Sequence, residues 1–151
     1  MTGTEHMGRV ARPRLAKVLA PEELTRLTAL TAGPGSGKTT LLGECFAERF
    51  AVWHTLTPAD KSLSVLARSI VRKLRLVAPQ ISSELVTAVE GARGPDVSVD
   101  SGRPLAIAAA LAHDLDDAVS RDIVLVLDDV HEIGDRGDGA NFLAALCRLV
   151  P

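Results

Sequence analysis

The sequence predicts an α/β fold in which helices cover both faces of a mostly parallel sheet, in three layers. Three observations support this fold class. Short apolar runs alternate with helical apolar stripes, a Gly-rich segment joins one run to a helix, and another run ends in two aspartates. The length of 151 residues, with 46% hydrophobic and 24% charged residues, suits one domain over residues 1–151 of ordinary soluble composition.

Three segments are expected as strands, because each has the length and apolar content of a buried strand and lies beside a turn or polar loop. In order, they are residues 27–32, 51–56 and 123–127. Five further segments show apolar residues at helical spacing, and a last helix follows them. The five are residues 14–20, 38–50, 61–77, 81–89 and 105–119, and the last helix is marked by Phe142, Leu143, Leu146, Leu149 and Val150.

Two of these helices have a well-defined predicted inner face. For residues 61–77 it consists of Leu63, Leu66, Ala67, Ile70, Val71 and Leu74. For residues 105–119 it consists of Leu105, Ala108, Ala112, Leu115 and Val119. The segments 57–60, 91–104 and 134–139 are rich in polar residues, Gly or Pro and are expected as loops, of which 91–104 is expected to be exposed.

Charge and composition exclude several classes of partner. Seventeen basic and nineteen acidic residues leave a net charge of −2, which provides no general attraction for a nucleic acid. The basic residues near the start of the chain are interpreted as a solvated terminal segment. No apolar run is long enough to cross a bilayer or to act as a secretory signal, so neither nucleic acid nor membrane is expected and the cytoplasm is the expected location.

The two cysteines, Cys45 and Cys147, lie in apolar helical patterns and have no metal-binding spacing. They are interpreted as small core residues of a protein in a reducing compartment.

The most informative segment is Ala-Gly-Pro-Gly-Ser-Gly-Lys-Thr-Thr at residues 32–40, which matches the Walker A pattern with alanine in place of its first glycine. Glycines let the backbone bring successive N–H groups close to phosphate oxygens, and the following helix directs its positive end at the same anion. Lys38 is expected to reach the β- and γ-phosphates, and the Thr39 hydroxyl to bind Mg²⁺. The predicted phosphate-binding residues are Gly33, Pro34, Gly35, Ser36, Gly37, Lys38, Thr39 and Thr40.

A second pattern is the apolar run 123–127 followed by Asp128 and Asp129. Ligands of parallel sheets bind beyond the carboxyl ends of the strands, so Asp128 and the Gly-rich loop are expected to meet in one crevice. Asp128 is predicted to bind Mg²⁺, and Asp129 to orient or deprotonate an attacking water, with Glu132 as a less favoured substitute. His131 is a weaker candidate for the γ-phosphate, because a structural or solvent-facing histidine is the simpler interpretation.

The stretches 12–15, 32–42 and 125–131 together resemble the ATPase module of maltose-activator-like, LuxR-type transcriptional regulators, which are STAND signal-transduction ATPases. The resemblance implies a P-loop NTPase fold that binds ATP or ADP with Mg²⁺ and self-associates in its ATP state. It also implies that Arg12, Arg14 and Leu15 help to seat the adenine. The Pro34-Gly35-Ser36 sequence is equally typical of AAA-type ATPases, and the sequence stops before the family's C-terminal strands, so a truncated module with partner domains in a longer chain is expected.

Several functional classes remain open at this point. The favoured one is a regulatory switch that binds ATP and slowly converts ATP and water to ADP and phosphate. An AAA-type mechanical or loader ATPase would share both motifs. A small-molecule kinase would need lid arginines, for which Arg93 and Arg103 are the candidates. A structural remnant that binds no nucleotide is the fourth possibility.

Overall fold

The computed structural model describes residues 13–19, 27–33, 35–46, 51–90, 102–118 and 123–150. The chain divides into two compact units, Met1–Glu48 and Arg49–Pro151, and each is described by itself. The expectation of one nucleotide-binding domain over residues 1–151 therefore stays a prediction.

The first unit contains two helices among its described residues. α1 runs over Pro13–Val18 and α2 over Lys38–Phe46. Both lie where apolar spacing predicts helices, although residues 47–50 of the predicted second helix lie outside the described residues. α2 buries Leu41 in its first half and Phe46 at its last residue.

The strand predicted at residues 27–32 is wrong. Residues 27–33 lie in no helix or strand, and Leu27 keeps 60% of its surface exposed. A strand exists only where a neighbouring strand exchanges backbone hydrogen bonds with it. The described residues of the first unit contain no such neighbour, so local apolar content alone did not produce a strand.

The second unit is a mixed α/β structure with more helix than strand. In chain order, its elements are β1 (Ala51–Thr55), η2 (Pro58–Lys61), α3 (Leu63–Leu74), α4 (Ser83–Glu90), α5 (Arg103–Ala118), β2 (Val124–Asp128), η4 (Val130–Ile133) and α6 (Asp138–Leu149). The two η elements are short 3₁₀ helices. The first overlaps the predicted polar loop 57–60 and extends to Lys61, where the next helix was expected to begin.

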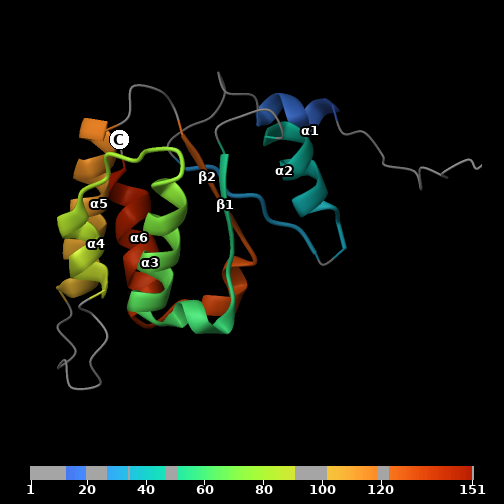
Figure 1. Ribbon diagram of the computed structural model, residues 1–151. Coiled ribbons are helices and arrows are strands. Elements are labelled where there is room, and N and C mark those ends of the chain that lie inside the picture. Colours follow the sequence, from blue (N-terminus) through green and yellow to red (C-terminus); the bar gives the residue numbers. More distant parts are fainter. Residues whose placement is uncertain are drawn as a thin grey trace, which may run out of the picture. The chain divides into compact units, whose positions relative to one another are not determined.

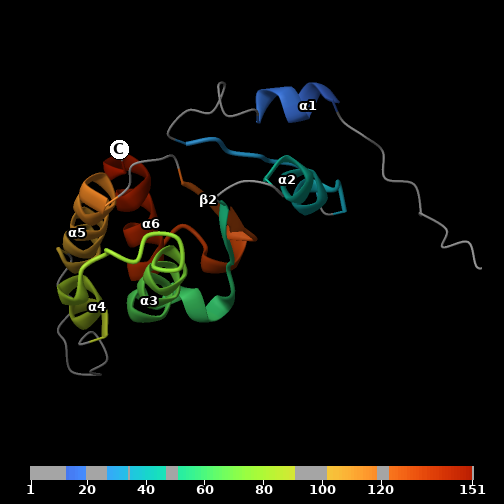
Figure 2. The ribbon, with the colours of Figure 1, turned by 45° about the horizontal axis from the view of Figure 1, so that its top comes forward.

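The predicted parallel pairing is confirmed for two strands. β1 and β2 pair in parallel, with Ala51 opposite Val124 and Thr55 opposite Asp128. Both strands therefore bring their carboxyl ends to the same edge of the sheet. Within this unit the helices lie on one side of the sheet, with α3 and α6 nearest to it (Figure 1; Figure 2). The three-layer arrangement of a P-loop NTPase stays a prediction.

The core of the second unit lies between the sheet and these helices. All six residues of the predicted inner face of residues 61–77 are buried in α3. β1 contributes Val52 and His54, whereas β2 is less buried than predicted, because only Val126 among its five residues is fully buried. The predicted burial is thus confirmed for α3 and only partly for β2.

The predicted inner face of α5 is partly wrong. Leu105 is 55% exposed, whereas Ile107 and Leu111 are buried together with the expected Ala108 and Ala112. Both faces have helical spacing and share their alanines. The two faces carry apolar side chains of similar size, so the packing of α5 against α6 and α4 selects the face with Ile107 and Leu111.

α6 begins against η2 at a position that admits no side chain. A Cβ built on Gly139 would overlap the carbonyl oxygen of Asp60 and lie 2.9 Å from that of Lys61. Both contacts are backbone atoms, which cannot rotate away. Gly139 therefore lets the first turn of α6 pack directly on η2. Because α6 begins at Asp138, the predicted loop 134–139 ends at Gly137.

Two further expectations concern the cysteines and the membrane. Cys45 and Cys147 are both unpaired thiols and half-buried rather than fully in the core. Burial raises the pKa of the Cys147 thiol above its usual value. In the described part of the chain, no helix combines the length and the apolar character needed to cross a bilayer.

Candidate functional site

The Gly-rich loop has the backbone that its sequence predicts. Gly35 and Gly37 have φ angles of 69° and 80°, a region that residues with a Cβ rarely adopt. No heavy atom lies within 4 Å of a Cβ built on Gly33 or Gly35. Glycine is thus required at residue 35 by the backbone angle and not by crowding, and the space beside the loop is open to an approaching group. Pro34 lies outside the described residues.

α2 begins directly at the end of this loop. The Leu41 N–H donates to the Gly37 carbonyl oxygen over 2.9 Å, which closes the first helical turn. The N-terminal end of a helix carries partial positive charge and attracts anions. Thr39 and Thr40 lie exposed in that first turn, where the predicted phosphate and Mg²⁺ contacts need them.

Two side chains of the loop have unusual surroundings. The Lys38 Nζ donates to the carbonyl oxygens of Ala32 and Gly33 over 2.8 and 3.1 Å, so the ammonium group caps its own loop. The Ser36 Oγ is buried and has no hydrogen-bond partner. A buried hydroxyl without a partner is unfavourable by roughly 1–3 kcal/mol. The loop therefore holds an unsatisfied polar atom beside a glycine cradle, which fits a site for a polar ligand.

The acidic end of β2 is anchored by the backbone. The Leu56 N–H donates to the Asp128 carbonyl oxygen over 2.9 Å, one residue beyond the pairing of Thr55 with Asp128. The Asp128 Oδ1 accepts the Asp129 N–H over 3.0 Å. Asp128 is half-buried at the carboxyl edge of the sheet, the position that the sequence predicts for a Mg²⁺ ligand.

Asp129 is the only described residue other than glycine with a positive φ, with φ 54° and ψ 40°. Aspartate tolerates this left-handed conformation better than most residues. Its Oδ1 lies 3.9 Å from the His131 Nδ1, and the His131 Nε2 lies 3.4 Å from the Glu132 Oε1. Asp129, its predicted substitute Glu132 and the γ-phosphate candidate His131 thus form one cluster after β2, in which Asp129 and His131 are exposed and Glu132 is half-buried.

The other predicted site residues are scattered or outside the described residues. Arg14 and Leu15 lie exposed on α1, and Arg12 lies outside the described part of the chain. Arg103 begins α5 as a half-buried residue, so it does not belong to a loop as predicted, and Arg93 is not among the described residues.

The two halves of the predicted site belong to different units. Lys38 and Thr39 lie in the first unit, and Asp128 lies in the second. That they meet in one crevice stays a prediction. No three His, Cys, Asp or Glu side chains gather as a metal site within the described ranges. Mg²⁺ is usually held by one or two carboxylates with phosphate oxygens and water, so the predicted Asp128 and Thr39 suit it without such a cluster.

A partly buried polar network at the end of β1 was missed by the sequence analysis. The Lys73 Nζ donates to the Trp53 carbonyl oxygen over 2.6 Å and lies 3.1 Å from the His54 Nδ1. The His54 Nε2 lies 3.1 Å from the Asp60 Oδ1. The Asp60 Oδ2 accepts the Thr57 N–H and hydroxyl over 2.8 and 2.9 Å. These residues are named the β1-end network: Trp53, His54, Thr57, Asp60 and Lys73.

The electrostatics of this network centre on Asp60, which is 2% exposed. Burial by itself raises the pKa of a carboxyl group. The hydrogen bonds from the Thr57 N–H and hydroxyl and from His54 outweigh it, so the pKa of Asp60 lies below its ordinary value of 3.8. Asp60 is therefore a carboxylate at neutral pH. The signal in the sequence was His54 at an inward-facing strand position, two residues after the apolar Val52.

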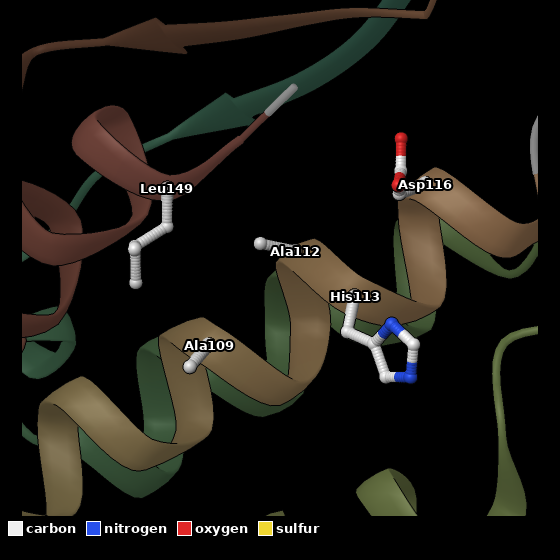
Figure 3. Close-up of a pocket in the computed structure, with 5 residues that line it drawn as sticks. All are labelled: Ala109, Ala112, His113, Asp116 and Leu149. Carbon is white, nitrogen blue, oxygen red and sulfur yellow. The ribbon is translucent and has the colours of Figure 1, made fainter.

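A surface pocket of about 250 Å³ lies between α5 and α6 in the second unit. Leu149 of α6 faces Ala109 and Ala112 of α5 across it, with His113 and Asp116 on its rim (Figure 3). Leu149 is the last residue of α6, a helix roughly 18 Å long whose first turn follows the Asp129 segment. The pocket therefore lies away from the carboxyl edge of the sheet and holds none of the predicted site residues.

Comparison of the chain with protein-family models, with curated proteins and with solved structures finds no significant match.

Proposed function

We propose that the chain is a nucleotide-binding module that holds ATP and Mg²⁺ through residues 33–40 and Asp128. The observation that carries this proposal is the backbone of the loop before α2. Gly35 and Gly37 have positive φ angles, α2 starts at once after them, and Lys38 lies against the loop carbonyls. A glycine cradle, a helix N-terminus and a lysine next to each other are the groups that a triphosphate requires.

Each residue has a defined task in this proposal. The backbone N–H groups of the loop bind phosphate oxygens, and Lys38 exchanges its bonds to Ala32 and Gly33 for bonds to the β- and γ-phosphates. The Thr39 hydroxyl and the Asp128 carboxylate hold Mg²⁺. When bound, the cation neutralises negative charge that develops on the phosphates.

Asp129 is proposed to orient the attacking water or accept its proton, converting ATP and water to ADP and phosphate. Its exposed carboxylate belongs to the same turn as Asp128, whose Oδ1 binds the Asp129 N–H. Slow turnover is expected, because arginine donors that stabilise the transferring phosphoryl group are often supplied by another chain or domain.

The finer proposal is a switch module of a signal-responsive transcriptional regulator. It rests on the sequence resemblance at residues 12–15, 32–42 and 125–131. A switch should self-associate in ATP and not in ADP. Size-exclusion chromatography with light scattering in each nucleotide measures this difference, and equal masses in ATP and ADP would remove the switch from the proposal. The alternative is an AAA-type ATPase, which would hydrolyse ATP faster than a regulatory switch.

Titration with a fluorescent ATP analogue tests the binding itself. Lys38→Ala should lower the affinity by at least about tenfold, equivalent to about 1.4 kcal/mol. Lys61→Ala is the matched control, because Lys61 is an exposed lysine at the end of η2 and should leave the affinity unchanged. Equal affinity in the wild-type protein and Lys38→Ala would overturn the phosphate site. ATP consumption only in the presence of a small-molecule acceptor would indicate a kinase instead.

A further inference from the structure

We propose that the β1-end network is a positioning device that holds Asp128 in place for Mg²⁺. This inference rests on the proposed function and adds residues to it that touch neither nucleotide nor metal. The network occupies the corner where β1 turns into η2 and α3 runs back beside the strand (Figure 1).

The direction of every hydrogen bond in the network is determined. An ammonium group only donates, so the His54 Nδ1 accepts from Lys73 and carries no proton. The neutral ring therefore has its proton on Nε2, from which it donates to the Asp60 Oδ1. The hydrogen bonds from Lys73 to His54 and from His54 to Asp60 therefore allow only one placement of the protons. Together they fix the orientation of the imidazole ring.

The far end of the network fixes the chain just before η2. The Asp60 Oδ2 receives two bonds from Thr57, and the Asp60 N–H donates back to the Thr57 carbonyl oxygen over 3.0 Å. Residues 54 and 57 are thus both tied to one carboxylate. Leu56 lies between them, and its N–H donates to the Asp128 carbonyl oxygen.

The network therefore acts on Asp128 through the backbone. His54 and Thr57 hold the chain on either side of Leu56, and Leu56 holds the last residue of β2. Buried ionic groups contribute little to stability compared with apolar residues of the same shape. A requirement for a defined position of Asp128 explains why the polar side chains of His54 and Asp60 are buried in this part of the core.

Lys73→Met tests the network, because it removes the ammonium group and keeps the aliphatic stem. Lys73→Arg retains donors and should restore the wild-type behaviour at least in part. Arg72→Met is the matched control, since Arg72 is the exposed neighbour of Lys73 on α3. Should Lys73→Met fail to fold, Thr57→Val replaces it, because this substitution at an exposed, extended residue removes the hydroxyl group that pairs with Asp60 and retains the bond from the Thr57 N–H to the Asp60 carboxylate.

The first measurement is amide hydrogen exchange. The Leu56 N–H should exchange about fivefold or more faster in Lys73→Met than in the wild type, as loss of one local hydrogen bond predicts. The Leu66 N–H on α3, which donates to Ser62, should be unchanged and so exclude global destabilisation. An unchanged exchange rate at Leu56 would overturn the proposed link to Asp128.

The second measurement is ATP affinity with and without Mg²⁺. Lys73→Met should reduce the gain in affinity that Mg²⁺ provides by about threefold or more and leave the Mg²⁺-free affinity unchanged. A purely structural role would not separate the two conditions. Lys38→Ala should weaken binding in both.

The two proposals fail in different ways. If the wild type binds no ATP in either condition, the proposed function is wrong and the positioning role ends with it. If the wild type shows the Mg²⁺ gain and Lys73→Met retains it in full, the nucleotide site stands and the network has no part in placing Asp128.

Discussion

The Lys38 Nζ donates to the carbonyl oxygen of Ala32 over 2.8 Å, so the lysine at the start of α2 folds back onto the loop that precedes it. The same ammonium group reaches the Gly33 carbonyl oxygen. The loop carbonyls therefore accept hydrogen bonds from the Lys38 ammonium group, which the proposed function pairs with the phosphates of ATP.

Removal of this ammonium group should loosen the loop. In Lys38→Met without nucleotide, the Ser36 N–H, which donates to Gly33 over 3.4 Å, should exchange roughly 2- to 10-fold faster. The range reflects about 0.5–1.5 kcal/mol for the lost hydrogen bonds. Hydrogen exchange measured by NMR checks this, with the Leu66 N–H as an internal reference. Unchanged exchange at Ser36 would show that Lys38 does not hold the loop.

Asp60→Asn should lower the free energy of unfolding at pH 7 by roughly 1–3 kcal/mol. An amide cannot replace the carboxylate, because its NH₂ group would face either the His54 Nε2–H or the Thr57 N–H, and both are donors. Chemical denaturation measures the loss. Asp135→Asn, at an exposed position, is the control and should change stability by less than about 0.5 kcal/mol.

The same variant has a defined pH dependence. The pKa of Asp60 is lowered on folding from 3.8, so its stabilisation is fully present above pH 3.8 and is lost as the pH falls through the lower folded value. The difference in unfolding free energy between wild type and Asp60→Asn should therefore shrink below pH 3.8. A difference that is constant down to pH 2 would contradict the assigned role of the charge.

Two substitutions at Asp129 distinguish the effect of its left-handed backbone conformation on stability from the effect of its carboxylate on ATP hydrolysis. Asp129→Ala should lower stability by about 1–2 kcal/mol, because alanine is disfavoured at φ 54°. Asp129→Asn tolerates this conformation and should leave stability and ATP affinity near wild type while lowering the rate of phosphate release. A wild-type rate of ATP hydrolysis in Asp129→Asn would show that this carboxylate has no part in the reaction.

Gly139→Ala should destabilise the second unit by about 1–3 kcal/mol through overpacking against η2. The better helix propensity of alanine, about 1 kcal/mol, opposes the loss only in part, because the clashing atoms belong to the backbone. Gly43→Ala in α2 is the matched control. Nothing lies within 4 Å of its added Cβ, so it should be neutral or stabilising in thermal unfolding.

Cys147 should react slowly with iodoacetamide at pH 8, since burial raises the pKa of its thiol and the thiolate is the nucleophile. In a Cys45→Ser background, the rate should rise several-fold when the chain is unfolded in urea. Mass spectrometry of the alkylated protein follows the reaction. Equal rates in the folded and unfolded chain would mean that Cys147 is not protected.

The sequence predicted those features that depend on local pattern. The six buried residues of α3 follow from helical spacing alone, and the positive φ angles of Gly35 and Gly37 follow from the chemistry of a glycine-rich loop. The features that depend on distant partners were not predictable. The segment 27–32 has strand-like composition, and it lacks a strand in its own unit with which to pair.

Two further differences have the same cause. In α5, two apolar faces overlap, and only the packing partners decide that Leu105 stays exposed while Ile107 is buried. Asp60 was expected in a polar loop, and it is buried in a 3₁₀ helix because His54 and Thr57 satisfy its carboxylate. A polar residue at an inward-facing position indicates that such a network exists. Its hydrogen-bond partners cannot be predicted from the sequence, because they depend on how the chain folds.

The parallel pairing of β1 with β2 also has a consequence for the order of folding. Ala51 pairs with Val124, and the whole of α3, α4 and α5 lies between them along the chain. Closing so long a segment costs more chain entropy than forming a helix turn, and it must precede any gain from the pairing. The helices should therefore acquire protection early in a refolding experiment, and the strand amides last.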